Sequence, residues 1–182
     1  IAPIQADLAE LADVAEPDLP TVRQFQHEAH VRIHGYVRRH DEQLAATRAW
    51  LEADSTRRVI ALGDATYPSS LLETADPPLL LYAQGRIELL HAVSIAIVGS
   101  RNPTAQGTDS ARAFAKHLSQ AGLAVVSGMA LGIDGAAHEG ALAGPGGTIA
   151  VMGTGADRIY PARHRALAHR IATGGVLVSE FA

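Results

Sequence analysis

Residues 123–138 read LAVVSGMALGIDGAAH, a stretch that contains a strand, a glycine-rich turn and the start of a helix. The run Leu123–Val126 is short, continuous and apolar, which is typical of a strand buried on both faces of a sheet. Glycines follow at 128 and 132, and the segment Ile133–Ala143 then has the length and the small apolar residues of a helix. The stretch therefore predicts one strand–turn–helix unit.

The same unit recurs along the second half of the chain. Apolar runs of strand length occupy Ile95–Val98, Thr148–Val151 and Val176–Val178, and the segments Gly107–Ala121 and Arg163–Thr173 have helix length. Alternation of strands and helices is the pattern of right-handed β-α-β crossovers. The sequence predicts an α/β fold with four strands in a mostly parallel sheet flanked by helices.

The chain before residue 92 has a different texture. Apolar positions recur at helical spacing before residue 54, which predicts a small and partial helical module. Short strands at Val59–Leu62 and Leu79–Tyr82, on either side of a short helix at Ser69–Glu73, then read as a linker. The predicted parts are the helical module 1–53, the linker 54–91 and the main domain 92–182.

The composition limits the class of protein. The 182 residues carry a net charge of −4 and no cysteine, which excludes disulfides and thiolate metal sites. Residues 92–182 hold seven Lys or Arg against five Asp or Glu, so nucleic acid would have to bind a local basic patch. Since no apolar run approaches membrane-spanning length and the N-terminus is acidic, a cytoplasmic protein without membrane contact is expected.

Glycine-rich turns follow three of the predicted strands. The carboxyl ends of parallel strands form the ligand-binding edge of an open α/β sheet, so we expect these turns to lie together. Glycines let backbone N–H groups approach a ligand and helix N-termini add a positive dipole, so this edge is predicted to bind phosphate. The candidate nucleic-acid or phosphate-binding residues are Gly99, Ser100, Arg101, Asn102, Ser127, Gly128, Gly132, Ile133, Asp134, His138, Gly153, Thr154, Gly155 and Arg163.

Enzymatic and metal-binding motifs are incomplete. The Gly153–Gly155 turn lacks the last glycine of the dinucleotide fingerprint, there is no Walker A, and no serine has the flanks of a nucleophile elbow. His30 and His34 have i, i+4 spacing but no third ligand. We therefore predict no catalytic residue, no cofactor and no metal. His138 is either a core or capping residue or a member of the crevice paired with Asp134, and both interpretations stay open.

Four ordered strings carry a family resemblance: AIVGSR at residues 96–101, VSGMALGIDGAAH at 126–138, TIAVMGTG at 148–155 and SEF at 179–181. YPSSLL at 67–72 and DPPLLLYAQG at 76–85 extend the match upstream, to about Asp54. This part of the chain resembles the DNA-processing protein A (DprA/Smf) family. The resemblance implies a Rossmann-like domain preceded by a sterile-alpha-motif-like helical module.

In function, the resemblance implies a protein that binds and protects single-stranded DNA and helps to load RecA recombinase during natural transformation. It also implies a homodimer and no catalytic turnover. Carried over by position, Gly99, Ser100 and Arg101 hold a DNA phosphate. The residues implied to line the same pocket are Ser127, Gly128, Gly132 and the turn Gly153–Gly155.

The chain departs from the family pattern in two places. Three residues after Pro161, where the family usually has asparagine, this chain has His164, and Arg163 and Arg165 are expected to supply positive charge there. Family members also continue past the SEF string with a basic stretch, more strands and often a winged-helix domain. The chain is therefore expected to be truncated, with an incomplete sheet edge.

Two rival functions compete with this interpretation of the sequence. Pro145–Thr148 faintly resembles the Pro-Gly-Gly loop of nucleoside-monophosphate phosphoribohydrolases, often misnamed lysine decarboxylases, which makes a Rossmann-like nucleotide enzyme the main alternative. Against this alternative, Gly147 and Thr148 are expected to enter a strand and not a helix. A purely structural or partner-docking domain would leave the three glycine turns unexplained.

Overall fold

The computed structural model describes residues 41–181. Most of the predicted helical module, including His30 and His34, lies outside the described residues, so the module stays a prediction. Residues 41–52, at its end, form a helix. Residues Ala45–Ala182 belong to one compact unit. Within this unit the Trp50 ring packs edge-on against Tyr82, with 5.8 Å between ring centroids, and the Arg57 guanidinium lies 5.0 Å from the Trp50 ring.

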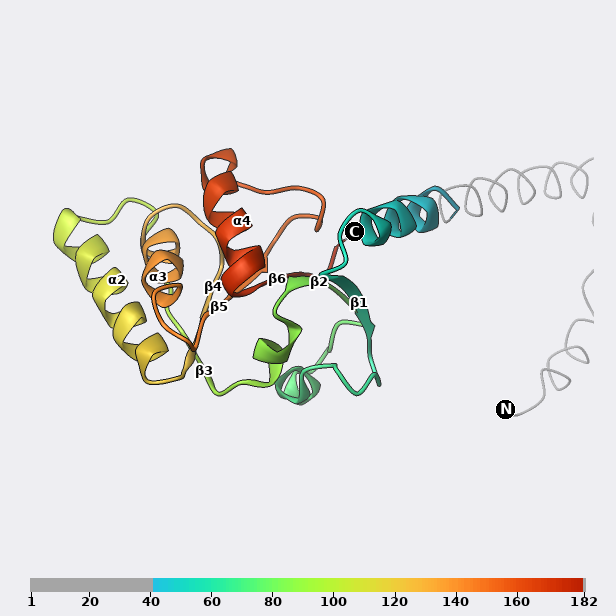
Figure 1. The fold of residues 1–182 in the computed structure, drawn as a ribbon, viewed down its shortest axis with the longest axis horizontal. Coiled ribbons are helices and arrows are strands. Elements are labelled where there is room, and N and C mark those ends of the chain that lie inside the picture. Colours follow the sequence, from blue (N-terminus) through green and yellow to red (C-terminus); the bar gives the residue numbers. More distant parts are fainter. Residues whose placement is uncertain (1–40, 182) are drawn as a thin grey trace, which may run out of the picture. The chain divides into compact units, whose positions relative to one another are not determined.

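Six strands of the described chain form one mixed sheet, in the order β1-β2-β6-β5-β4-β3 (Figure 1). Neighbours among β3, β4, β5 and β6 are parallel, whereas β1 pairs with β2, and β2 with β6, in antiparallel fashion. The strand bounds are β1 Arg57–Ala61, β2 Leu80–Gly85, β3 Ser94–Ala96, β4 Ala124–Ser127, β5 Thr148–Met152 and β6 Val176–Ser179. The predicted α/β fold is confirmed, and the two strands assigned to a linker belong to the same sheet. The three-part division of the chain stays a prediction.

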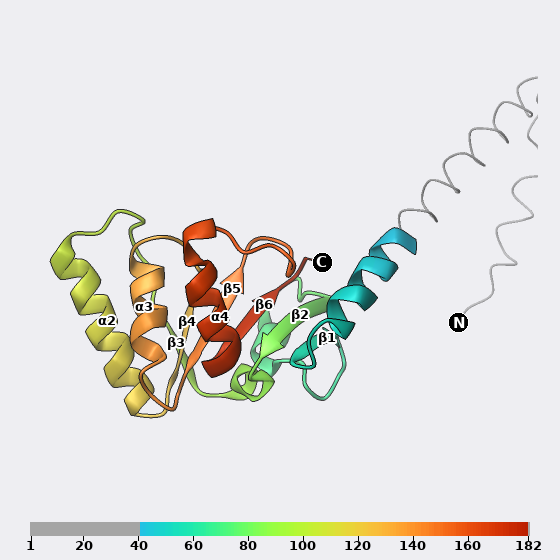
Figure 2. The ribbon, with the colours of Figure 1, turned by 45° about the horizontal axis from the view of Figure 1, so that its top comes forward.

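Three α-helices lie side by side on one face of the parallel strands (Figures 1 and 2). Their bounds are α2 Ala105–Gln120, α3 Ile133–Ala141 and α4 Arg165–Gly174. The chain crosses the sheet in one direction, from β3 through β4 and β5 to β6. Because β-α-β crossovers are right-handed, connections that advance in one direction leave their helices on the same face.

Strand alternation divides the core between the two faces of the sheet. Ala150 and Leu177 pack with Ile171 of α4, whereas Ile149 belongs to a cluster on the opposite face. Successive side chains of a strand point to opposite faces, which explains why adjacent residues of β5 enter different clusters. The cluster that contains Ile149 also contains Leu89 from the 3-10 helix η3 (Ile87–His91). The predicted short helix Ser69–Glu73 is confirmed as the 3-10 helix η2.

Strand β3 ends the sheet on one side. Ile95 is 43% exposed and Val98, just beyond the strand, is 72% exposed. The prediction that the run Ile95–Val98 is buried on both faces is wrong for these residues. The reason is topological: β3 is an edge strand with one neighbouring strand, so one of its sides is open. Ile97 still packs against the cluster that contains Val125.

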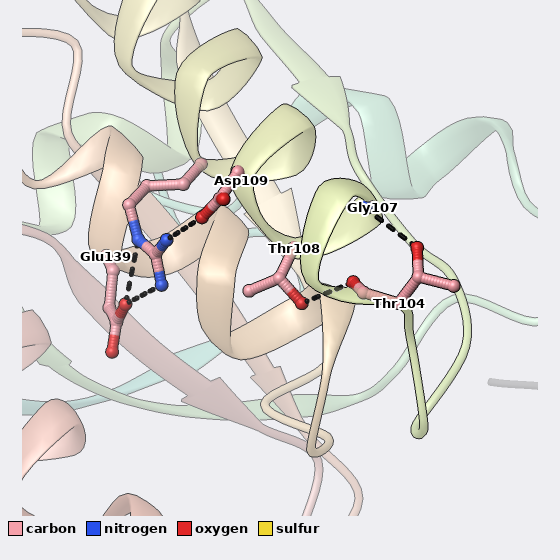
Figure 3. Close-up of polar contacts among 6 residues, drawn as sticks. Thr104, Gly107, Thr108, Asp109 and Glu139 are labelled. Carbon is pink, nitrogen blue, oxygen red and sulfur yellow. Dashed lines mark hydrogen bonds and ion pairs between the residues drawn. The ribbon is translucent and has the colours of Figure 1, made fainter.

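Helix α2 begins directly after the turn that follows β3. Thr104 is its N-cap: the Thr104 hydroxyl accepts from the Gly107 amide at 3.1 Å, and the Thr108 hydroxyl donates to the Thr104 carbonyl (Figure 3). An N-cap of this kind satisfies an otherwise unpaired amide of the first turn. The cap therefore fixes where the β3 turn ends and the helix starts.

Helices α2 and α3 approach each other closely. A Cβ atom at Gly140 of α3 would collide with the Arg112 carbonyl oxygen of α2, so the two backbones are nearly in contact. The Arg112 guanidinium also pairs with Asp109 of α2 at 3.0 Å and with Glu139 of α3 at 2.9 Å; Figure 3 shows the two carboxylates. The close packing gives α3 a fixed position, and α3 carries much of the candidate site at its N-terminal end.

Candidate nucleic-acid interface

Three turns meet at one edge of the sheet. β3, β4 and β5 are parallel neighbours, so the segments that follow them leave the sheet at the same edge. These segments are the first turn (residues 97–103), the second turn (128–132) and the third turn (153–161). The sequence prediction that the glycine-rich turns lie together therefore agrees with the sheet topology.

The first turn presents a cation that has no partner among residues 41–181. Arg101 is exposed, and within the described part of the chain it makes no ion pair and no side-chain hydrogen bond. Next to it the Ser100 hydroxyl accepts from the Asn102 amide at 3.1 Å, which folds the turn around Arg101. Gly99, Ser100 and Asn102 are exposed as well. This turn is open to a ligand from the solvent.

The start of α3 holds the first turn in place. The Ile133 amide donates to the Ser100 carbonyl at 3.1 Å. A Cβ atom added at Gly99 would stand only 2.8 Å from Cγ1 of Ile133, so only glycine leaves room for this side chain. Gly132 has a φ of +83°, and a Cβ atom there would collide with the Ser100 carbonyl oxygen. Gly132 and Ile133 therefore support the turn that carries Arg101.

The second turn is occupied by a side chain of the protein itself. The Gly128 and Ala130 amides both donate to Asp134 Oδ2 at 3.2 Å, and Asp134 is only 6% exposed. The Ser127 hydroxyl is also committed, since it donates to the Ile97 carbonyl at 2.7 Å. The backbone amides expected to face a phosphate thus face a carboxylate. Asp134 and Ser127 therefore hold the backbone of the turns in place through hydrogen bonds inside the protein.

His138 lies in the core and not on the crevice surface. The imidazole is 0% exposed, and its Nδ1 is 2.7 Å from the Thr148 hydroxyl, which itself donates to the Val125 carbonyl. Because that hydroxyl proton is already used, Nδ1 must carry the proton and donate. Burial lowers the pKa of His138 from 6.5 to about 4; the Asp134 carboxylate opposes this shift and His164 adds to it. Of the two interpretations left open, the structure favours the core histidine.

The third turn is tied to the end of β6. Gly153 is exposed with open space beside it, the Ser179 hydroxyl donates to the Thr154 carbonyl, and the Ala156 amide donates to the Phe181 carbonyl. The Thr154 hydroxyl donates to the Arg158 carbonyl at 2.7 Å, which closes the turn on itself.

A contact that the sequence did not predict joins the segment after the third turn to the second turn. His164 Nδ1 lies 2.9 Å from the Met129 carbonyl oxygen, and Arg163 beside it is exposed. The one sequence signal for His164 was its replacement of the family's usual asparagine, and that signal did not identify a partner.

The candidate residues fall into three groups. Those exposed at the edge are Gly99, Ser100, Arg101, Asn102, Gly128, Gly153 and Arg163. Those half-buried behind it are Gly132, Ile133, Thr154 and Gly155. Those buried and bonded within the protein are Ser127, Asp134 and His138. The exposed group is where a ligand can make contact, and the two others keep it in position.

The loop that resembles a phosphoribohydrolase motif lies elsewhere. Gly147, with a φ of +64°, turns the chain into β5, and Thr148 is the first residue of that strand. This loop is at the amino end of β5, whereas the three turns follow the carboxyl ends. It therefore contributes nothing to the candidate site, and the enzyme alternative is not favoured.

Residues 41–181 contain neither a membrane-spanning helix nor a cluster of metal-binding side chains. No helix there has the length and apolar character needed to span a bilayer. No cluster of three or more histidine, aspartate or glutamate side chains in this range has a geometry suited to a metal ion.

In architecture, the described chain is a Rossmann-like α/β domain with its candidate site at the carboxyl edge of the parallel strands. Comparison with known proteins gives the family, because residues 58–182 match the family described as DNA recombination-mediator protein A. The chain belongs to this family. The family is one of recombination mediators and is not known for enzymatic activity.

Named relatives agree with the family. The chain is 39% identical over 141 residues to Protein Smf of Escherichia coli, an alignment that covers 77% of this chain and 37% of the relative. It is 42% identical over 118 residues to the DNA processing protein DprA of Streptococcus pneumoniae, covering 65% of this chain and 42% of that protein. The chain thus spans about two fifths of the length of these relatives.

Two solved structures are similar in fold. The structure of DprA from Streptococcus pneumoniae superposes with a TM-score of 0.64 and 38% identity, over 74% of this chain and 47% of that one. DNA processing protein A from Helicobacter pylori, whose structure is described for its single-stranded DNA binding mode, superposes with a TM-score of 0.61 and 33% identity, over 68% and 56%. These likenesses support the predicted Rossmann-like fold.

Proposed function

We propose that this chain binds single-stranded DNA through the phosphate backbone, with Arg101 as the principal contact. The observation that carries the proposal is the exposed Arg101 in a turn that Gly132 and Ile133 hold from behind. A guanidinium without a partner, next to exposed backbone and a hydroxyl, offers a bidentate phosphate contact. The single-stranded DNA binding described for the Helicobacter pylori relative supports the same ligand.

The other exposed members of the edge complete the proposed site. Ser100, Asn102 and Gly153 offer small polar or backbone surfaces along the edge, and Arg163 adds a second cation. Contacts of this kind recognise phosphates and not base edges, so we expect little sequence preference. The buried Asp134 and His138 take part by supporting the turns and make no contact with DNA.

The test is a fluorescence-anisotropy titration with labelled single-stranded and duplex oligonucleotides across a salt series. Arg101→Ala should weaken single-strand binding about tenfold, or about 1.4 kcal/mol. It should also lower the slope of log K against log salt by about 0.7, the value for one phosphate contact on a single strand. The folded state should be unaffected, since Arg101 has no partner among the described residues.

Arg112→Ala is the matched control. Arg112 is an arginine of the same domain, but its guanidinium is already paired with Asp109 and Glu139. We expect it to leave the salt slope at the wild-type value. A wild-type slope in Arg101→Ala, or an equal loss in both variants, would contradict the assignment of Arg101.

For the complete protein we propose the role of its family: protection of incoming single-stranded DNA and loading of RecA recombinase during natural transformation, by a cytoplasmic homodimer. Family membership supports this role. Light scattering of the full chain tests the dimer. The loading is tested by the ATPase activity of RecA on DNA covered with single-strand-binding protein. The wild-type protein should accelerate the onset of this activity, and Arg101→Ala should need a higher protein concentration for the same effect.

A further inference from the structure

One side chain fastens the segment after the third turn to the second turn. His164 ends the 3-10 helix η4 (Ala162–His164), and its Nδ1 lies 2.9 Å from the Met129 carbonyl oxygen. A carbonyl oxygen can only accept, so Nδ1 carries the proton and donates. η4 contains no buried residue itself, and it continues directly into α4, whose Leu167 and Ile171 are buried in the core. α4 therefore holds one end of this short helix, and the His164 hydrogen bond links that end to the second turn.

The His164 ring also lies against the first turn of α3. A Cβ atom at Gly135 would stand 2.9 Å from Cε1 and 3.0 Å from Nε2 of the imidazole, both closer than such contacts normally come. The next atom near that position is the Ala130 carbonyl oxygen at 3.9 Å. Glycine at position 135 thus leaves room for this ring in particular, and α3 and His164 fit each other.

The start of α3, which contacts His164, also contacts the backbone of Arg101. Gly132 lies three residues before Gly135, about 4.5 Å along the helix axis at 1.5 Å per residue. A Cβ atom at Gly132 would lie 2.8 Å from the carbonyl carbon of Arg101. The start of α3 therefore touches the first turn at Gly132 and His164 at Gly135. One rigid element sets the spacing between Arg101 and η4.

We propose that His164 is a positioning residue of the DNA site, which holds Arg163 so that Arg163 and Arg101 contact phosphates of one strand. This inference rests on the proposed single-strand binding. Arg163 precedes His164 directly, is exposed, and makes no ion pair or side-chain hydrogen bond within the described residues. Without the His164 hydrogen bond η4 stays joined to α4 but loses its link to the second turn, so the position of Arg163 relative to Arg101 is less well prearranged.

The experiment is a double-mutant cycle on the full chain, measured as anisotropy of a labelled oligothymidylate across a potassium chloride series. Arg163→Ala should lower the salt slope by about 0.7. His164→Ala should lower it by a similar amount although it removes no arginine. The double variant should be no weaker than Arg163→Ala alone, since both changes remove the same contact.

Two further variants separate positioning from general damage to the fold. His164→Asn should restore the wild-type slope, because the asparagine amide nitrogen stands at the same number of bonds from Cβ as Nδ1 and can donate to Met129. Gly135→Ala keeps His164 but displaces its ring, and alanine favours the helix. Gly135→Ala should reproduce the reduced salt slope of His164→Ala while its far-ultraviolet circular dichroism and thermal midpoint stay at the wild-type values. If His164→Ala does not fold, Gly135→Ala alone tests the positioning role.

The outcomes distinguish this inference from the proposed function. If the wild type binds and Arg101→Ala weakens binding, but His164→Ala and Gly135→Ala keep the wild-type slope, the positioning role is wrong and the DNA site stands. Additive losses in the double variant would also overturn the positioning role. If the wild type does not bind single-stranded DNA, the proposed function fails and this inference fails with it.

Discussion

The buried His138 makes stability depend on pH in a defined direction. In the folded protein its pKa is about 4, mainly because burial disfavours the charged imidazolium, whereas an unfolded histidine has a pKa of about 6.5. As the pH falls from 7, the unfolded chain takes up this proton first. His138 therefore contributes its full stability above pH 6.5, and that contribution is lost progressively as the pH falls to about 4.

The size of the effect follows from the two pKa values. Each pKa unit corresponds to about 1.36 kcal/mol, so a fall from 6.5 to about 4 represents about 3 kcal/mol. Such a loss is a large fraction of the stability of a typical domain, which is about 5–15 kcal/mol. The nearby Asp134 carboxylate limits the shift, so removing its charge should enlarge the pH dependence.

Urea denaturation followed by circular dichroism, repeated at intervals between pH 7 and pH 4, measures this effect. The reference is His138→Gln, which keeps a donor for Thr148 but cannot titrate. The free energy of unfolding of the wild type should fall by about 3 kcal/mol more than that of the variant across this range. His169→Gln, which removes an exposed imidazole from α4, should follow the wild-type curve. Parallel curves for wild type and His138→Gln would refute the reasoning.

Three substitutions test how the candidate site is supported. Gly132→Ala should destabilise the fold by about 2 kcal/mol or more in thermal denaturation, because a side chain would have to adopt a positive φ and overlap the Ser100 carbonyl; an unchanged midpoint would mean that the first turn moves freely. Asp134→Ala should cost about 1–3 kcal/mol in urea denaturation, since two backbone amides lose their acceptor, and near-neutrality would show that water replaces the carboxylate. Glu139→Gln removes one partner of the half-exposed Arg112 and should cost less than about 1 kcal/mol in the same assay; a larger loss would indicate that this pair is structurally important.

The sheet could be predicted because its signals are local. Continuous apolar runs such as Leu123–Val126 and the glycines after them are visible within a dozen residues, and the four parallel strands follow from their alternation with helices. The exposure of Ile95 could not be predicted in the same way. A strand in the centre of a sheet and a strand at its edge have the same apolar run, and only the order of the strands distinguishes them.

The sequence predicted that the three glycine-rich turns share one edge of the sheet, but it did not predict the hydrogen bonds within and between them. Arg101 follows a strand end and is recognisable from sequence as a cation at the binding edge. The Asp134 carboxylate, in contrast, turns back to the Gly128 amide six residues earlier, and His164 reaches Met129 across 35 residues of sequence. Such contacts depend on side-chain direction and on the distance between turns, which periodicity and spacing do not encode.

The carboxylate in the second turn bears on which ligands the edge can select. Asp134 is attached to α3, so it competes for the Gly128 and Ala130 amides as a tethered anion, at an effective concentration of the order of millimolar or more. A free mononucleotide would have to displace this tethered competitor to use those amides. A polymer with successive phosphates does not need the Gly128 and Ala130 amides, because its phosphates can contact the exposed Arg101 and Arg163 instead. If the edge binds DNA as proposed, the Asp134 carboxylate in the second turn would favour long chains with several phosphates over small metabolites.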